Sequence, residues 1–124
     1  MDLNVLAEQK ALGFYVVSLE GSLDTNTHIV LQEKVDNILK ESPNTIAFDM
    51  EKLEYISSAG VRVVLKTRKA LKEYNGKLVF LKIQPQVKKV FDIINALPSM
   101  QVFTSIKELD EYLDAIQKKV LAEE

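Results

Sequence analysis

Hydrophobic residues along the chain follow two patterns, one typical of buried strands and the other of amphipathic helices. Three short apolar runs are rich in β-branched and aromatic residues and lie next to glycine, proline or asparagine. They cover residues 13–21, 45–49 and 77–83, and each of them predicts a strand. Residues 3–11 are also mostly apolar and are expected to pair with the first of these strands, and residues 101–104 are expected to form a short edge strand.

Between the predicted strands, apolar residues recur three and four positions apart, as they do on the buried face of a helix. Asn75 and Gly76 form a helix stop signal, and Pro85 fits the first turn of the next helix. Ser105 and Glu108 have the spacing of a capping box. The predicted helices cover residues 25–40, 58–74, 85–95 and 105–120.

Strands that alternate with helices indicate an α/β fold. The chain has 124 residues, a length that suits one domain, so residues 1–124 are expected to form a single domain. We predict a small mixed, largely parallel sheet of four to five strands, flanked by four to five helices. Residues 50–57 are predicted to form a loop that leads into the helix at residues 58–74.

The composition excludes most kinds of catalytic and metal site. The chain has no cysteine and one histidine, His28, which excludes disulfide bonds, thiolate metal sites, cysteine nucleophiles and histidine-rich sites. The four glycines are not arranged as a dinucleotide-binding fingerprint or as a phosphate-binding loop. Asp24, Asp49 and Glu54 each follow a predicted strand, but carboxylates are common in such loops. We therefore expect a protein that is not an enzyme, with no catalytic residues, no cofactor and no metal.

The charge is unevenly distributed, although the net charge is only −2. Residues 61–90 contain nine basic residues and one acidic residue, so this segment is basic and the rest of the chain is acidic. The low net charge argues against general nucleic-acid binding, whereas a dipolar chain can steer a protein partner of matching polarity. The first residues lack the basic start and the apolar stretch that are typical of a signal peptide, and no apolar run approaches the roughly 18 residues of a membrane span. We expect a cytoplasmic protein without membrane insertion.

Two serines stand where the predicted helix at residues 58–74 begins. A helix N-terminus has unpaired backbone N–H groups and a partial positive charge, and the hydroxyl of Ser57 or Ser58 can cap such groups. Ala59 and Gly60 keep the first turn small, so another molecule could approach the backbone closely. These features are typical of an ordinary helix cap as well as of a functional site.

A polar stripe runs along the same predicted helix. Arg62, Lys66 and Lys69 follow Ser58 at steps of four, four and three, so all four side chains are expected on one exposed face. Ser58 and Arg62 would then lie one turn apart. A phosphate on Ser58 would meet both the helix N-terminus and a guanidinium group.

Residues 53–65, with the sequence LEYISSAGVRVVL, resemble the signature loop and helix of the STAS domain, a family named for sulfate transporters and anti-sigma factor antagonists. Residues 21–24 resemble the glycine–x–leucine–aspartate turn of that family, and Asp49 matches the acidic residue that closes the strand before the signature loop. Residues 75–78 and 87–91 resemble the later strand and helix. The resemblance extends over almost the whole chain.

The resemblance implies a function in bacterial partner switching. The unphosphorylated domain would bind an anti-sigma factor that is also a serine kinase, the kinase would phosphorylate a serine at the start of the signature helix, and a PP2C-type phosphatase would restore the binding form. Alignment on Gly60 places the acceptor at Ser58. Many such antagonists have an aspartate before the acceptor, where this chain has Ser57, so Ser57 is the alternative acceptor. The expected partner-binding residues are Asp24, Tyr55, Ile56, Ser57, Ala59, Gly60, Arg62, Lys66 and Lys69.

Two other functions remain open beside the leading prediction of a monomeric anti-sigma factor antagonist. The absence of an aspartate before Ser58 favours a STAS scaffold subunit of a transport or signalling complex, with no phosphoswitch. A response-regulator receiver phosphorylated on Asp49 would need an acidic pair after the first strand to hold magnesium. Glu20 is the single acid at that place, which argues against the receiver.

Overall fold

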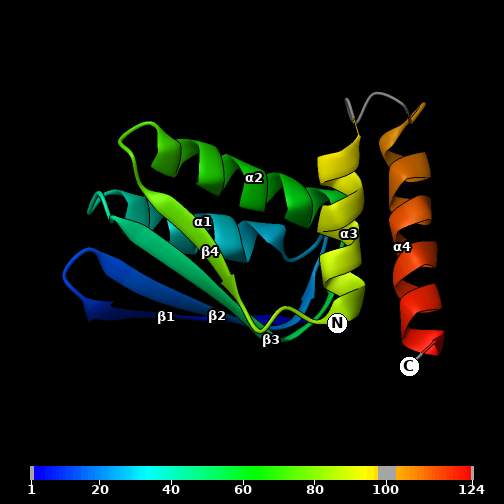
Figure 1. Ribbon diagram of the computed structural model, residues 1–124, viewed down its shortest axis with the longest axis horizontal. Coiled ribbons are helices and arrows are strands. Elements are labelled where there is room, and N and C mark those ends of the chain that lie inside the picture. Colours follow the sequence, from blue (N-terminus) through cyan, green and yellow to red (C-terminus); the bar gives the residue numbers. More distant parts are fainter. Residues whose placement is uncertain (1, 98–102, 124) are drawn as a thin grey trace.

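Strands and helices follow one another largely as the hydrophobic pattern predicts. The computed structural model describes residues 2–97 and 103–123, and these contain four strands and four helices (Figure 1). In chain order the elements are β1 (Leu3–Ala11), β2 (Phe14–Leu23), α1 (His28–Leu39), β3 (Thr45–Ile56), α2 (Ser58–Lys72), β4 (Lys77–Leu81), α3 (Pro85–Ala96) and α4 (Ile106–Ala122).

The four strands form one mixed sheet in the order β1-β2-β3-β4. β1 pairs with β2 in the antiparallel sense, whereas β2, β3 and β4 run parallel to one another. This arrangement confirms the predicted α/β class with a largely parallel sheet. It also confirms that residues 3–11 pair with the strand that follows them.

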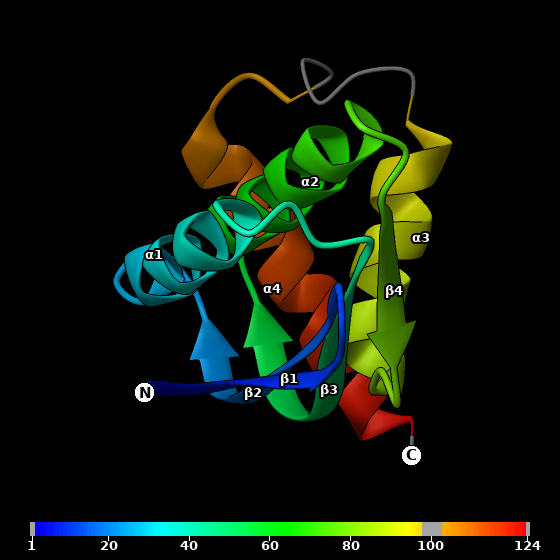
Figure 2. The ribbon, with the colours of Figure 1, turned by 90° about the vertical axis from the view of Figure 1, so that its left-hand side faces the viewer.

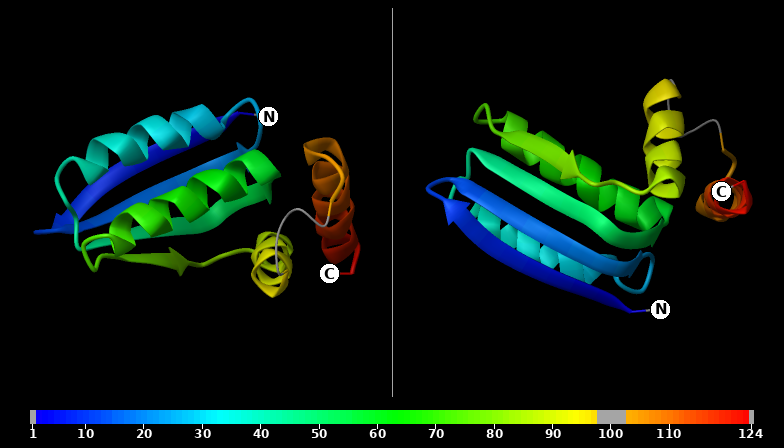
Figure 3. Two further views of the ribbon diagram at one scale, coloured as in Figure 1. Left: turned by 90° about the horizontal axis from the view of Figure 1, so that it is seen from above. Right: turned by 60° about the horizontal axis from the view of Figure 1, so that its bottom comes forward.

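Helices α1 and α2 lie side by side over one face of the sheet (Figure 2). The main hydrophobic core lies between them and the strands, where Val17 of β2, Phe48 of β3 and Leu31 of α1 are fully buried. No helix of the described chain covers the opposite face of the sheet (Figure 3). Helices α3 and α4 pack against each other beyond the end at which the parallel strands finish (Figure 1).

Strand β3 is longer than the sequence predicts. The predicted loop at residues 50–57 is wrong over most of its length, because β3 continues to Ile56 and stays paired with β2. Two register irregularities interrupt that pairing, and the adjacent residues Glu51 and Lys52 are both exposed. A bulged strand loses the strict alternation of buried and exposed positions, so the hydrophobic pattern alone does not reveal it.

The predicted helices are confirmed, with small differences at their ends. α1 begins at His28 rather than at residue 25, and Ser105 caps α4 as predicted, because its Oγ accepts a hydrogen bond from the Glu108 N–H at 3.1 Å. Of the predicted edge strand at residues 101–104, the first two lie outside the described residues, and the last two form a bend. Within the described chain, no helix is long and apolar enough to cross a membrane.

Helix α4 buries a different set of side chains from the one that its apolar residues predict. The apolar residues Leu109 and Leu113 are buried, but the apolar Ile106 in the first turn is 52% exposed. Gln117 is buried instead, with an exposure of 1%. A buried amide side chain needs hydrogen-bond partners, and those of Gln117 lie in the candidate site.

Candidate functional site

Two loops meet at the end of the sheet toward which the parallel strands run. Asp24 follows β2, and Ser57 joins β3 to α2. The N–H of Ser57 donates a hydrogen bond to the carbonyl of Leu23 at 2.9 Å. Residues 21–24 and 55–60, which the sequence predicts to form one docking region, therefore lie together.

Asp24 shapes the turn that leads into α1. Its Oδ1 accepts hydrogen bonds from the N–H groups of Asn26 at 2.9 Å and of Thr27 at 3.1 Å. The Thr27 hydroxyl in turn donates to the carbonyl of Ser22 at 2.7 Å. An aspartate that binds backbone groups two and three residues ahead stabilises a tight turn, so Asp24 has a structural role in addition to any contact with a partner.

Gly60 lets the first turn of α2 approach the ends of β2 and β3. A Cβ atom at this position would lie 2.7 Å from Leu23 Cγ, 2.8 Å from Ile56 Cγ1 and 2.9 Å from the carbonyl oxygen of Leu23. Carbon atoms that are not bonded do not approach so closely without strain. Glycine at position 60 therefore allows α2 to pack this closely on the sheet.

Both candidate acceptor serines are buried. Ser57 is 4% exposed and Ser58 is 1% exposed, so the prediction that Ser58 lies on the exposed face of α2 is wrong. Ser57 occupies the N-cap position, but its side chain makes no capping hydrogen bond. Its Oγ has no hydrogen-bond partner among the described residues. The N-terminus of α2 is therefore not capped by either serine.

Side chains of α4 cap α2 and cover residues 55–58, which we term the switch segment. Asp110 Oδ1 accepts a hydrogen bond from the N–H of Ser58 at 2.8 Å, which places a carboxylate where the helix dipole favours negative charge. Gln117 binds both backbone groups of Ile56: its Nε2 donates to the carbonyl at 2.8 Å, and its Oε1 accepts from the N–H at 3.0 Å. Figures 1 and 3 show the N-terminal end of α2 directed at the α3–α4 pair.

Tyr55 lies in acidic surroundings. Burial, followed by the charges of Asp114 and Asp110, raises the pKa of the Tyr55 phenol to about 12. A hydrogen bond with Asp114 and the charge of Asp24 act in the same direction. The carboxylates oppose the formation of a phenolate, so Tyr55 is a neutral hydrogen-bond donor at physiological pH.

The basic stripe of α2 is exposed, as the sequence predicts. Arg62, Lys66 and Lys69 form no ion pair with any other described residue. Arg62 and Lys66, together with Ala59 and the half-exposed Ile29 of α1, line a groove of about 210 Å³ between α1 and α2. Lys69 continues the stripe along α2 but does not line the groove. The structure thus brings three of the expected partner-binding residues into one groove.

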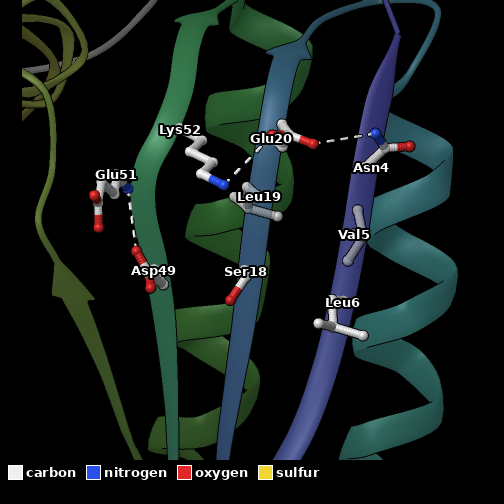
Figure 4. Close-up of a pocket in the computed structure, with 9 residues that line it drawn as sticks. All are labelled: Asn4, Val5, Leu6, Ser18, Leu19, Glu20, Asp49, Glu51 and Lys52. Atoms are coloured by element: carbon white, nitrogen blue, oxygen red, sulfur yellow. Dashed lines mark hydrogen bonds and ion pairs between the residues drawn. The ribbon is translucent and has the colours of Figure 1, made fainter.

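A larger hollow of about 530 Å³ lies on the open face of the sheet (Figure 4). Glu20 accepts a hydrogen bond from Asn4 Nδ2 at 3.3 Å and pairs with Lys52 Nζ at 3.8 Å. Asp49 also lines this hollow, and its Oδ1 accepts a hydrogen bond from the N–H of Glu51 at 3.1 Å. None of the expected partner-binding residues lines it, and nowhere in the described chain do three acidic or histidine side chains converge as metal ligands would.

Three residues of α4 at this site, Asp110, Asp114 and Gln117, were not predicted from the sequence. They follow one another at steps of four and three, so they share one face of α4. The spacing of these polar residues could have been recognised in the sequence. The residues that they contact could not, because Ser58 lies 52 residues before Asp110, and Ile56 lies 61 residues before Gln117.

Comparison with known proteins identifies relatives of this chain. Residues 6–109 match the profile of the family described as STAS domain. BtrV of Bordetella bronchiseptica, to which an anti-sigma factor antagonist function is attributed, is 31% identical over 100 residues, which cover 81% of this chain and 86% of BtrV. The family match ends at residue 109, immediately before the first of the three α4 residues that contact the switch segment.

Solved structures of the anti-sigma factor antagonist SpoIIAA share the fold. The unphosphorylated form superimposes with a TM-score of 0.64 and 26% identity, over 73% of this chain and 83% of SpoIIAA. The phosphorylated form of the Bacillus protein gives a TM-score of 0.63 and 25% identity, over 73% of this chain and 82% of that protein.

Proposed function

Because this chain belongs to the STAS domain family, we propose that it is an anti-sigma factor antagonist that works by partner switching. Its unphosphorylated form binds an anti-sigma factor that is also a serine kinase, and a sigma factor is released. The kinase then transfers the γ-phosphoryl group of ATP to Ser58 Oγ, the hydroxyl loses its proton, ADP leaves, and the complex dissociates. A PP2C-type phosphatase hydrolyses the phosphoserine. In this role the protein has no enzymatic activity of its own and acts in the cytoplasm as a monomer.

The position of Ser58 carries this proposal. Ser58 is the first residue of α2, two residues before the glycine that packs α2 onto the sheet, and residues 21–24 lie beside it. BtrV and SpoIIAA are described as anti-sigma factor antagonists, and SpoIIAA is known in a phosphorylated form. These observations support Ser58 as the acceptor, with the adjacent Ser57 as the alternative.

The proposed docking surface has its centre at the N-terminus of α2 and a basic border along that helix. Its centre is the turn at residues 21–24 with residues 55–60, and its border is the stripe of Arg62, Lys66 and Lys69. Because these three cations have no partners among the described residues, they are available to an acidic surface. Complementary charge at a border mainly accelerates association.

Phosphorylation would act as a switch because it adds charge inside this surface. A phosphoserine carries roughly −1.5 to −2 charges at neutral pH. In the free protein water can solvate that charge once the N-terminus of α2 is exposed, whereas an unpaired charge buried in a complex costs several kcal/mol. A difference of about 3 kcal/mol weakens binding more than a hundredfold, since 1.4 kcal/mol corresponds to a factor of ten.

The test is phosphorylation and binding with the cognate kinase. We expect incubation with kinase and ATP to place one phosphate on Ser58, as mapped by mass spectrometry. Ser58→Ala should bind the kinase in the presence of ATP as well as in its absence, whereas Ser58→Asp should stay folded and bind at least a hundredfold more weakly. Ser57→Ala is the matched control and should keep the switch. Phosphate on Ser57 would move the acceptor by one residue.

The alternative function is a STAS scaffold subunit without a phosphoswitch. Two observations favour it: Ser57 stands where many antagonists have an aspartate, and Ser58 is 1% exposed. If the kinase that co-purifies with the protein phosphorylates neither serine, the result favours the scaffold function over the phosphorylation switch.

A further inference from the structure

Helix α4 holds the switch segment through side chains on one of its faces. Asp110 binds the N–H of Ser58, and Gln117 binds the N–H and the carbonyl of Ile56. Asp114 lies close enough to the Tyr55 phenol to raise its pKa. Helix α4 therefore holds the backbone of Ile56 and Ser58 and places a carboxylate near Tyr55. All three α4 residues lie beyond residue 109, where the family match ends.

We propose that α4 is a displaceable cover over the switch segment, and that Ser58 becomes accessible only when α4 moves away. This inference rests on the proposed function of Ser58 for its biological meaning, but the opening itself does not depend on a kinase. A kinase must bring the γ-phosphate of ATP to the serine hydroxyl, which requires an exposed side chain. At 1% exposure, Ser58 does not meet that requirement while α4 is in place.

The cover and a phosphate compete for the same helix N-terminus. Asp110 already occupies the N–H of Ser58 with a carboxylate oxygen at 2.8 Å. A phosphate on Ser58 would bring a second anion to the same place, and like charges at this distance repel. Because coupling between two equilibria is reciprocal, closure of α4 opposes phosphorylation, and a phosphate on Ser58 opposes closure. Helix α4 must therefore move away before Ser58 is phosphorylated, and phosphoserine at position 58 then favours the open state.

Several features make opening of α4 easier than unfolding of the sheet. Only Leu109, Leu113 and Gln117 of α4 are buried, whereas the core beneath α1 and α2 contains buried residues of β1, β2 and β3. The closed state also leaves the buried Ser57 Oγ without a partner among the described residues, which disfavours closure. Regions with few buried apolar contacts open locally at lower free energy than the global transition.

A single engineered thiol measures this opening. The natural chain has no cysteine, so Ser58→Cys introduces one thiol of nearly the same size as the serine hydroxyl group. Its reaction with Ellman's reagent reports access to position 58. We expect the folded protein to react at least tenfold more slowly than the same protein in denaturant. A folded protein that reacts as fast as the denatured one would overturn the proposal.

Variants of α4 should then release the thiol. In the Ser58→Cys background, Asp110→Ala and Gln117→Ala are each expected to accelerate labelling at least tenfold. The matched controls are Asp92→Ala on α3 and Gln32→Ala on α1, which remove exposed hydrogen bonds to Lys88 and Asp36 away from the switch segment. Controls within twofold of the parent support the proposal, and equal rates in all variants contradict it.

Hydrogen exchange separates local opening from global unfolding. In Gln117→Ala, the amides of Ile56 and Ser58 should exchange at least tenfold faster, while those of Val17 and Phe48 in the core keep their protection. Equal loss of protection at all four amides would mean global unfolding and would overturn the cover. These measurements involve no kinase. The proposal that α4 covers the switch segment can therefore be correct even if Ser58 is never phosphorylated, and Ser58 can be phosphorylated even if that proposal is wrong.

Competition between the two anions has its own test. Ser58→Asp should lower the exchange protection of the α4 amides at least tenfold, and Asp110→Asn in the same chain should restore most of it. If Ser58→Asp leaves the protection of α4 unchanged, the two anions do not compete and this part of the inference is wrong.

Discussion

Replacement of Gly60 by alanine tests whether close packing of α2 on the sheet supports the site. The added Cβ would lie 2.7 Å from Leu23 Cγ, 2.8 Å from Ile56 Cγ1 and 2.9 Å from the Leu23 carbonyl oxygen. The carbonyl oxygen belongs to the backbone of β2 and accepts a hydrogen bond from the Ser57 N–H. Neither the strand nor this turn can move without loss of that bond.

Two effects of opposite sign decide the size of the change. Alanine has a better helix propensity than glycine by about 1 kcal/mol in a helix interior. Extra volume in a well-packed core usually costs about 1–3 kcal/mol, and three simultaneous contacts below 3.0 Å place this site at the upper end. We therefore expect Gly60→Ala to lower the free energy of unfolding by about 1–2 kcal/mol. Domains are stable by about 5–15 kcal/mol, so the variant should remain folded.

Urea denaturation followed by circular dichroism measures this change. The midpoint should fall while the slope stays constant, as expected when stability changes and the exposed surface does not. Lys66→Ala is the control, because it adds no volume and lies at an exposed position of the same helix. Its stability should stay within about 0.5 kcal/mol of the parent. A Gly60→Ala protein as stable as the parent, or more stable, would refute the packing argument.

Two further predictions concern charge. The phenol of Tyr55 should titrate near pH 12, against an ordinary value of 10.0, as followed by ultraviolet absorbance. Because its pKa is higher in the folded than in the unfolded protein, its contribution to stability is complete below pH 10 and is lost as the pH rises towards 12. The double variant Arg62→Glu and Lys66→Glu should associate with the anti-sigma factor at least tenfold more slowly and with a weaker salt dependence, as measured by stopped-flow mixing. The control is the double variant Lys72→Glu and Lys77→Glu, which changes the last residue of α2 and the first residue of β4. Equal association rates for the two double variants would show that the basic stripe is only a solvated surface.

The fold could be predicted from the sequence because its elements carry local signals. The strand at residues 77–81 is a short apolar run that follows glycine. The helix at residues 106–122 has apolar residues at helical spacing, and Ser105 supplies its capping signal. The prediction of a loop at residues 50–57 was wrong for a physical reason. β3 carries bulges there, and a bulge disrupts the alternation that identifies a strand.

The candidate site could be predicted only in part. The spacing of Arg62, Lys66 and Lys69 placed them correctly on an exposed stripe, because exposure of α2 is determined by the sheet beneath it. The same spacing placed Ser58 on that exposed stripe, and this was wrong. Helical spacing describes one helix and contains no information about a second helix that folds over its end, as α4 does with Asp110.

The neutral residue at position 57 is compatible with the carboxylate that Asp110 places at the N-terminus of α2. The resemblance to STAS antagonists implies an aspartate at the position before the acceptor, and its carboxylate would lie at the N-terminus of α2. Here Ser57 is neutral and 4% exposed, and the carboxylate at that helix N-terminus comes from Asp110 of α4. An aspartate at position 57 would place a second carboxylate next to the first, and the two would repel each other. A serine at position 57 avoids this repulsion, so Asp110 can supply the capping carboxylate of α2 without a competing charge beside it.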